Sequence, residues 1–129
     1  MINKQATLSV ITVVFNNSAD IERTIKSVIN QTYPHIEYII IDGGSTDGTL
    51  NIIQKHLARV SKLVSEKDEG IYDAMNKGLK LASGDYVLFM NSGDEIYAAD
   101  TVEKVFSTEE YSDIYYGETE MFNNRWESL

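Results

Sequence analysis

Several common features are missing from this sequence of 129 residues, and each absence excludes a class of protein. There is no cysteine, which excludes disulfides and metal sites built from thiolates. The longest apolar run, residues 8–15, is far too short to cross a bilayer. The first residues also lack the apolar stretch of a signal peptide. We therefore expect a cytoplasmic protein.

Positive charge is also scarce, because 11 lysines and arginines face 20 aspartates and glutamates. The resulting net charge of −9 argues against a general affinity for DNA or RNA. An acidic protein can still hold a diphosphate if a divalent cation lies between the two. The composition therefore leaves phosphate-containing ligands open, provided that a metal ion accompanies them.

Apolar segments rich in β-branched residues alternate with segments of helical periodicity. Strands are predicted at residues 8–15, 36–41, 60–65, 86–90 and 114–116, and helices at 18–30, 45–57, 71–82 and 100–106. Ser18 and Ser45 are the expected N-terminal caps of the first two helices, and Ser83-Gly84 the expected end of the third. This alternation predicts an α/β, Rossmann-like fold of three layers around a mainly parallel sheet.

Four polar turns follow the predicted strands, at the edge where open α/β sheets bind their ligands. The first turn combines Phe15 with Asn16 and Asn17, an aromatic ring and two amides that could hold a flat base and its polar edge. The alternative is an ordinary hydrophobic strand end followed by a turn. The second turn places Asp42 before Gly43-Gly44, where the backbone can approach a ligand closely.

The third turn contains Asp68 and Gly70 and precedes a predicted helix that carries Asp73. A surface pair of Asp73 with Lys77, four residues later, is the alternative interpretation of that acid. Asp94 ends the fourth turn and is a hard oxygen donor that suits Mg²⁺ or Mn²⁺. Each acid alone is explained as a turn residue. Their position at one edge of one sheet favours a polar ligand held with a metal ion.

Four motifs in this order resemble the nucleotide-sugar half of glycosyltransferase family 2. They are residues 9–16, 42–49, 68–78 and 84–94, within a similarity that runs from about residue 7 to residue 117. The resemblance implies an A-type glycosyltransferase fold, incomplete at its C-terminus. It also implies a single nucleotide-diphospho-sugar-binding domain over residues 1–129, with its core at 7–117 and the acceptor-binding half absent.

The resemblance further implies binding of a nucleotide-diphospho-sugar, with a UDP-sugar favoured, together with Mg²⁺ or Mn²⁺. The sugar would be transferred with inversion to a glycan or lipid-linked acceptor in polysaccharide biosynthesis, with peripheral association at the inner face of a membrane as one option. By matching position, the nucleotide-sugar site would include Thr12, Phe15, Asn16, Asp42, Asp68, Gly70, Asp73 and Gly93, with Asp94 as the metal ligand.

Within that resemblance, Thr12 and Phe15 would line the base pocket, and Asp42 would bind the base or the ribose. Asp68 and Asp73 would lie near the ribose, the diphosphate or the donor sugar.

Two departures from the family pattern affect this interpretation. The family often has an acid immediately before the metal-binding position, where this chain has Gly93, so that contact is lost or made by the backbone. The catalytic base of the family lies in the later acceptor-binding half, and no residue here matches it.

Two alternatives therefore stay open. A truncated or degenerate relative would hold a nucleotide-sugar without turnover, as a non-catalytic binding module. A receiver-like signalling domain also fits the length, the acidity and the alternation of strands and helices. Such domains need clustered acids after the first strand and a lysine after the fifth, whereas this chain has Phe15-Asn16-Asn17 and Gly117-Glu118 at those places.

Overall fold

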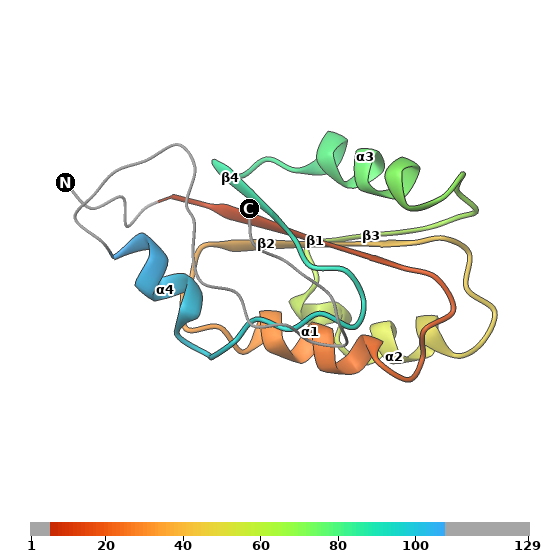
Figure 1. The fold of residues 1–129 in the computed structure, drawn as a ribbon, viewed down its shortest axis with the longest axis horizontal. Helices are drawn as coiled ribbons and strands as arrows, with labels where there is room; N and C mark the ends of the chain where they lie inside the picture. Colours follow the sequence, from red (N-terminus) through yellow and green to blue (C-terminus); the bar gives the residue numbers. More distant parts are fainter. Residues whose placement is uncertain (1–5, 108–129) are drawn as a thin grey trace.

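The computed structural model describes residues 6–107, which form a parallel sheet with helices on both faces. The elements are β1 (Leu8–Val14), α1 (Ile21–Ile29), β2 (Ile36–Asp42), α2 (Thr49–Lys55), the short 3₁₀ helix η1 (Leu57–Arg59), β3 (Lys62–Ser65), α3 (Ile71–Leu81), β4 (Tyr86–Phe89) and α4 (Thr101–Phe106) (Figure 1). This order confirms the predicted alternation. The strand predicted at 114–116 lies outside the described residues. No helix within 6–107 has both the length and the apolar character to span a membrane.

The strand order is β3-β2-β1-β4, and every neighbouring pair is parallel. The chain steps outward from β1 to β3 and then returns to the other side of β1 to form β4. The direction of winding therefore reverses between β1 and β4, and ligands of open α/β sheets bind at the carboxyl ends of the strands at such a point. In the register of the sheet, Val14 lies beside Asp42 at this carboxyl edge.

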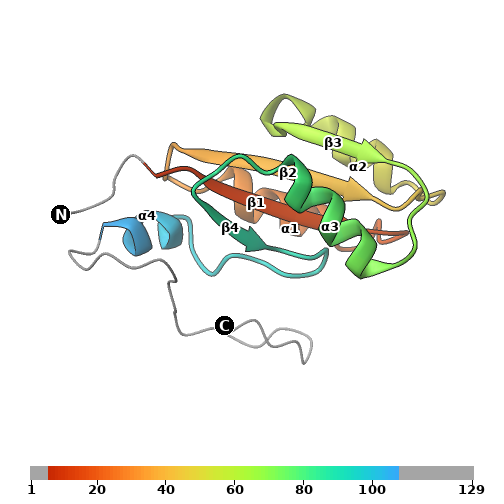
Figure 2. The same ribbon diagram turned by 90° about the horizontal axis from the view of Figure 1, so that it is seen from above.

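Strand β1 is buried on both faces, as its continuous β-branched sequence predicts. On one face, Val10 and Val14 pack in a cluster with Ile25 of α1; on the other, Ile11 and Val13 pack with Ala74 of α3. Figure 1 shows α1 and α2 below the sheet and α3 above it. Viewed from above, α3 lies over β1 and β2, with which it makes its main contacts (Figure 2). The layers agree with the predicted fold.

Helices α1 and α2 begin later than their sequence signals indicate. α1 begins at Ile21, after Asp20 and not after Ser18, and α2 begins at Thr49. Ser45 does not cap α2, because its hydroxyl donates to Asp42 Oδ1 at 2.5 Å. α2 ends at Lys55, two residues before the predicted end, and Leu57 lies beyond it and is 46% exposed.

The end of α3 also differs from the prediction. The helix ends at Leu81, and Ala82, not Gly84, is the C-cap residue, with an extended backbone (φ −71°, ψ 133°). Gly84 has a different requirement, since a Cβ there would lie 2.6 Å from Ser9 Oγ and 2.7 Å from the carbonyl oxygen of Thr7. The glycine therefore allows the turn before β4 to approach β1 closely.

Candidate functional site

A cavity of about 340 Å³ opens at the carboxyl ends of β1 and β4, next to the first turn of α3. It is lined by Val13, Val14, Phe15, Asn17, Asp68, Gly70, Ile71, Ala74, Asn91 and Ser92. These residues come from three separate loops and the strands and helix beside them. The cavity therefore lies where the strand order reverses, the position expected for a ligand site.

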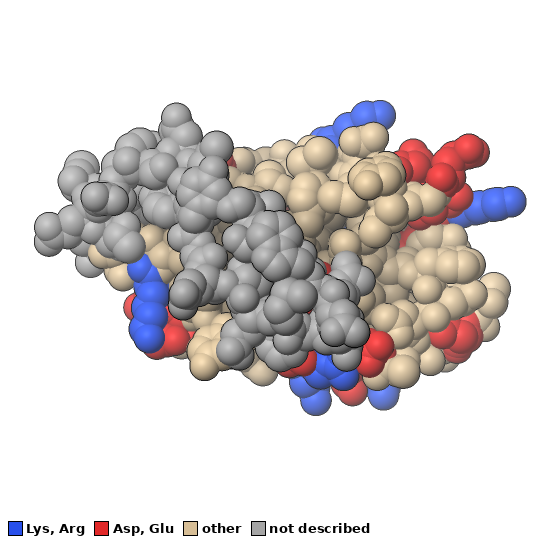
Figure 3. Space-filling model, viewed as in Figure 1, with Lys and Arg blue, Asp and Glu red and all other residues tan. Residues whose placement is uncertain are grey.

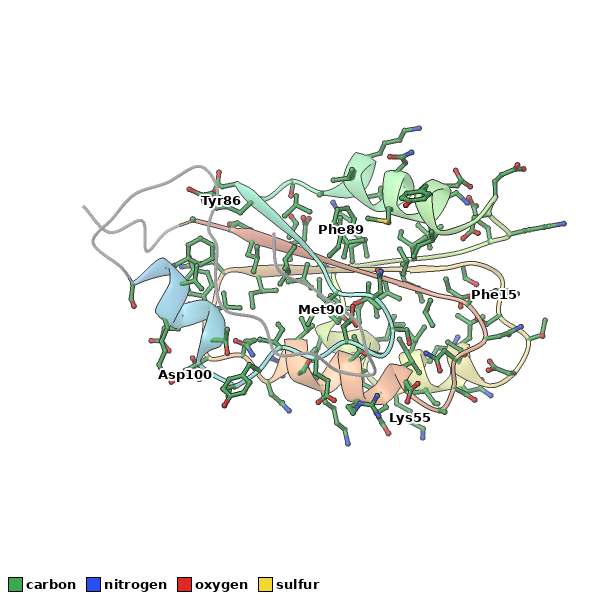
Figure 4. All side chains as sticks on the ribbon, in the orientation of Figure 1. Phe15, Lys55, Tyr86, Phe89, Met90 and Asp100 are labelled. Atoms are coloured by element: carbon green, nitrogen blue, oxygen red, sulfur yellow. The ribbon has the colours of Figure 1, made fainter. Side chains whose placement is uncertain are left out.

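The wall formed by the end of β1 combines an aromatic ring with an amide. The Phe15 side chain is 61% exposed, and Figure 4 shows it at the opposite end of the molecule from Tyr86, which begins β4. Asn17 Nδ2 donates to Ser92 Oγ at 3.0 Å and so connects the loop after β1 to the loop after β4. An exposed ring beside hydrogen-bonding groups is suited to a flat heterocycle.

Asn16 is not among the cavity residues, although the sequence predicted it there. Its backbone has φ 46°, a left-handed conformation that asparagine tolerates better than most residues. In this conformation, Asn16 Oδ1 accepts a hydrogen bond from Thr46 N–H at 2.8 Å, and its own N–H donates to Ser45 Oγ at 2.8 Å. Asn16 therefore joins the loops after β1 and β2, and Asn17 is the amide at the cavity.

Thr12 was also predicted to line the base pocket, but it lies in the core. It is fully buried, and its hydroxyl lies 2.8 Å from the Tyr38 hydroxyl. Thr12 lies within β1 and is not among the residues that line the cavity, whereas Val13 and Val14 at the end of the strand are. Burial raises the pKa of Tyr38, and its phenol stays protonated in this contact. Thr12 is a core residue in this structure, and it does not line the cavity.

Asp68 and Gly70 line the cavity, as predicted for the loop after β3. Asp68 Oδ1 accepts the N–H of Gly70 at 3.1 Å, which fixes the loop locally. Asp73 lies outside the cavity: its Oδ2 accepts the N–H of Glu69 at 2.9 Å and lies 3.7 Å from Lys77 Nζ. Asp73 thus stabilises the start of α3, and its contact with a ligand stays a prediction.

Asp42 is fully buried, and both of its carboxylate oxygens accept hydrogen bonds from the protein. Oδ2 accepts from Gly44 N–H at 3.1 Å, Ser45 N–H at 2.9 Å and the Ser65 hydroxyl at 2.9 Å. Oδ1 accepts from the Ser45 hydroxyl. Asp42 therefore holds the turn after β2 against the end of β3. Its direct contact with a base or ribose stays a prediction.

Asp94 follows β4 and is 2% exposed, within a turn closed by its own N–H bonding the Asn91 carbonyl oxygen at 2.9 Å. Gly93, immediately before it, has φ 103°, a conformation that favours glycine. The Gly93 N–H donates to Thr24 Oγ1 at 2.8 Å. The Gly93 N–H is therefore occupied within the protein, and a ligand contact from this residue would have to use its carbonyl oxygen.

The oxygen atoms near this turn fit a hard divalent cation. Asn91 Oδ1 is buried and accepts no hydrogen bond from residues 6–107, and Asn91 lines the cavity. Mg²⁺ and Mn²⁺ prefer carboxylate and carbonyl oxygens, and Mg²⁺ is commonly held by one or two carboxylates together with phosphate oxygens and water. Among the described residues no cluster of three His, Cys, Asp or Glu could hold a metal by itself. A cation at Asp94 would therefore draw further oxygens from Asn91, from water or from a ligand.

The sequence offered Asn17 as one of the two amides after the first strand, but it did not assign Asn91 or Ser92 to the site, although both belong to the fourth turn. Their common signal is an amide or hydroxyl in the turn directly after a strand, in addition to the acid. Thr24 had no such signal, because it lies on a helix and approaches the fourth turn only in the folded chain.

Taken together, the fold and the cavity define an α/β domain with a candidate ligand site at the carboxyl edge of its sheet. The model of glycosyl transferase family 2 matches residues 9–124, and the chain belongs to this family. Family membership also removes the receiver-like alternative.

Relatives of known sequence and structure agree with this assignment. A PGL/p-HBAD biosynthesis glycosyltransferase of Mycobacterium bovis BCG is 37% identical over 126 residues, which cover 92% of this chain and 49% of the relative. The chain therefore spans about half the length of this curated relative.

Two solved structures have the same architecture. TarS 1–349 of S. aureus, in complex with UDP-GlcNAc, is 29% identical, with a TM-score of 0.69 over 76% of this chain and 29% of TarS 1–349. The mannosyltransferase PcManGT of Pyrobaculum calidifontis, in complex with GDP-Man and Mn²⁺, is 25% identical, with a TM-score of 0.69 over 79% of this chain and 32% of that enzyme. These similarities confirm the A-type glycosyltransferase fold.

Proposed function

We propose that this chain is the donor-binding part of an inverting glycosyltransferase and binds a nucleotide-diphospho-sugar, in the first instance a UDP-sugar, with Mg²⁺ or Mn²⁺. The observation that carries the proposal is the cavity between the ends of β1 and β4, which brings Phe15, Asn17, Asp68 and Asn91 together. The UDP-GlcNAc complex of TarS and the GDP-Man and Mn²⁺ complex of PcManGT support a nucleotide-sugar with a divalent metal.

In this proposal each part of the ligand contacts a different group of residues. The exposed Phe15 ring packs against the base, and Asn17 presents a polar group next to it. The Asp68 carboxylate accepts hydrogen bonds from hydroxyls of the ribose or the donor sugar. Asp94 and Asn91 would hold the divalent cation, which lies between the protein and the diphosphate.

The proposed reaction is a single displacement at the anomeric carbon. The oxygen of an acceptor hydroxyl forms a bond to that carbon while the bond from the carbon to the diphosphate oxygen breaks, and the electron pair leaves with the nucleoside diphosphate. A base accepts the hydroxyl proton. A bound divalent cation stabilises the negative charge on the leaving group. We propose a glycan or a lipid-linked glycan as the acceptor.

The charge of the chain makes the cation central to this proposal. At a net charge of −9, the protein repels a free nucleoside diphosphate. Figure 3 shows acidic side chains at the right-hand end of the molecule, which is the end where β1, β2 and β3 finish in Figure 1. A cation shared by Asp94 and the diphosphate compensates for that repulsion.

Titration calorimetry with UDP and Mn²⁺ tests this proposal. We expect the wild-type chain to bind UDP in the presence of Mn²⁺, and Asp94→Asn to weaken that binding by about tenfold or more, since it removes the charge that holds the cation. Asp100→Asn is the matched control: it makes the same chemical change at Asp100, which lies 3.4 Å from Lys104, and should bind like the wild type. Absence of UDP binding by the wild type, or equal binding by Asp94→Asn, would refute the proposal.

A non-catalytic binding module is the second candidate for this chain. One observation favours it: among the described residues that line the cavity, Asp68 is the sole carboxylate, and we assign it to binding. A measurement of UDP release from UDP-GlcNAc, with and without an added acceptor, distinguishes the glycosyltransferase from the binding module. Turnover by the chain rejects the binding module, whereas tight Mn²⁺-dependent binding without turnover supports it.

A further inference from the structure

Helix α1 holds the segment that carries Asp94 through polar side chains on one of its faces. Thr24 and Ser27 lie three positions apart, so they are neighbours on that face. Thr24 Oγ1 accepts a hydrogen bond from Gly93 N–H at 2.8 Å, and Ser27 Oγ accepts one from Ile96 N–H at 3.1 Å. These two contacts lie on either side of Asp94, at the N–H of the residue before it and at the N–H two residues after it.

A third side chain, Gln31, holds the same segment farther along. Gln31 Nε2 donates to the carbonyl oxygen of Ala98 at 2.6 Å, and Gln31 Oε1 accepts from Val102 N–H at 3.1 Å. We call Thr24, Ser27 and Gln31 the α1 seam. The residues that the seam bonds lie at different distances from Asp94 along the chain. Of the three seam residues, only Thr24 bonds a direct neighbour of Asp94, namely Gly93.

The Thr24 contact is the most enclosed of the three. Thr24 is fully buried, Gly93 is buried, and the bond joins residues 69 positions apart in the sequence. Gly93 also has φ 103° and therefore makes a sharp change of direction immediately before Asp94. A buried N–H that loses its acceptor is costly to leave unpaired. Without the Thr24 hydroxyl, the turn would shift until that N–H found another partner.

We infer that Thr24 is a positioning residue for the metal-binding turn: its hydroxyl fixes the peptide between Ser92 and Gly93 and thereby the direction of the Asp94 carboxylate. This inference rests on the proposed function, in which Asp94 holds the divalent cation. Mg²⁺ requires nearly ideal octahedral geometry at about 2.0–2.1 Å, so a small rotation of a ligand reduces affinity. Ser27 and Gln31 bond the segment after Asp94, and in this inference they do not set the direction of the Asp94 carboxylate.

The test measures Mn²⁺ affinity in the 129-residue chain at saturating UDP, from the loss of the EPR signal of free Mn²⁺. Thr24→Val removes the hydroxyl and keeps the shape, whereas Thr24→Ser keeps the hydroxyl. Ser27→Ala is the matched control, because it removes a hydroxyl from the same seam without touching Gly93. We expect about tenfold weaker Mn²⁺ binding by Thr24→Val. Thr24→Ser and Ser27→Ala should stay within about twofold of the wild type.

The outcomes separate this inference from the proposed function. Wild-type Mn²⁺ affinity in Thr24→Val, alongside normal UDP binding, overturns the positioning role and leaves the proposed function intact. Equal weakening by Thr24→Val and Ser27→Ala shows a merely structural role and also overturns the inference. If the wild type binds neither UDP nor Mn²⁺, the proposed function fails, and this inference fails with it.

A measurement on the wild type covers the case in which Thr24→Val does not fold. The Gly93 amide signal in the NMR spectrum should exchange slowly with solvent and should shift when Mg²⁺ and UDP are added together. Exchange of the Gly93 amide at the rate of an open loop, or no shift on adding Mg²⁺ with UDP while the amide of Asp94 shifts, contradicts the positioning role.

Discussion

Asp68 reaches the cavity because Gly43, on the neighbouring loop, has no side chain. A Cβ at Gly43 would lie 2.8 Å from Asp68 Oδ2, closer than such atoms approach in folded proteins. Gly43 does not have a positive φ, so alanine is compatible with its backbone, and the contact with Asp68 is the only obstacle. The position of an acid that we assign to ligand binding thus depends on a glycine in the loop after the adjacent strand, β2.

Gly43→Ala should therefore destabilise the protein by about 1 kcal/mol, the low end of overpacking costs because the atom it meets ends a partly exposed side chain, and should weaken UDP binding, since Asp68 must move. Urea denaturation and calorimetry measure the two effects. The matched control is the same substitution in an Asp68→Ala background, where the obstacle is gone and the stability loss should largely disappear. Equal losses in both backgrounds would show that the contact with Asp68 is not the cause.

At the level of single residues, the sequence predicted which turns form the site better than it predicted which side chains face the cavity. Asp68, Gly70 and Phe15 line the cavity as expected. Thr12 does not, because a strand that is buried on both faces carries no polar alternation to show which side faces a ligand. Asn17 lines the cavity and Asn16 does not, because Asn16 has a positive φ that local sequence does not determine.

Among the elements, the amino end of the sheet is held together by one carboxylate. Glu37 on β2 accepts hydrogen bonds from the hydroxyl of Ser9 on β1 at 2.6 Å and from Ser83 N–H at 2.9 Å, and it lies 3.1 Å from Lys62 Nζ on β3. Burial raises the pKa of Glu37, but the hydrogen bonds from Ser83, Ser9 and Lys62 outweigh it and lower this pKa to about 2.

This low pKa predicts a pH-dependent contribution of Glu37 to stability. The folded pKa is about 2 and the unfolded one 4.5, so the contribution is complete above about pH 4.5 and is lost as the pH falls toward 2. Urea denaturation should show Glu37→Gln less stable than the wild type by on the order of 2 kcal/mol at pH 7. The two stabilities should converge near pH 2. A stability difference that is constant from pH 7 to pH 2 would contradict this account.

The order and type of the elements followed from periodicity, whereas their ends followed from tertiary contacts. The predicted start of α2 at Ser45 was wrong because the buried Asp42 carboxylate binds that hydroxyl. Asp47 Oδ1 instead accepts the N–H of Thr49, the first residue of α2, at 2.9 Å. The hydrogen bonds from the Thr49 hydroxyl and the Thr49 N–H lower the pKa of Asp47 to about 2. Capping rules consider only local sequence and cannot weigh such a competitor.

For the molecule as a whole, the parallel sheet and its binding edge were predictable from the sequence, because strands that alternate with helices leave few topologies. The strand order β3-β2-β1-β4 places the ends of β1 and β4 side by side. This arrangement brings Asn17 Nδ2 to 3.0 Å from Ser92 Oγ. The α1 seam was not predictable, since Thr24 and Gly93 meet only after the chain has crossed the sheet. The sequence pattern thus predicted the edge of the sheet at which the cavity lies, whereas the contacts that support this edge appear only in the folded chain.

The most direct test of the central claim is to map bound Mn²⁺ on the ¹⁵N-labelled chain by paramagnetic broadening of its amide NMR signals, with UDP present. We predict that sub-stoichiometric Mn²⁺ broadens the signals of Asn91, Asp94 and Asn17, and that EDTA restores them. Signals of Glu37 and Ser83, at the amino end of the sheet, should stay sharp. Broadening centred on the amino end, or spread evenly over the exposed acids, would contradict a cation site at the carboxyl edge.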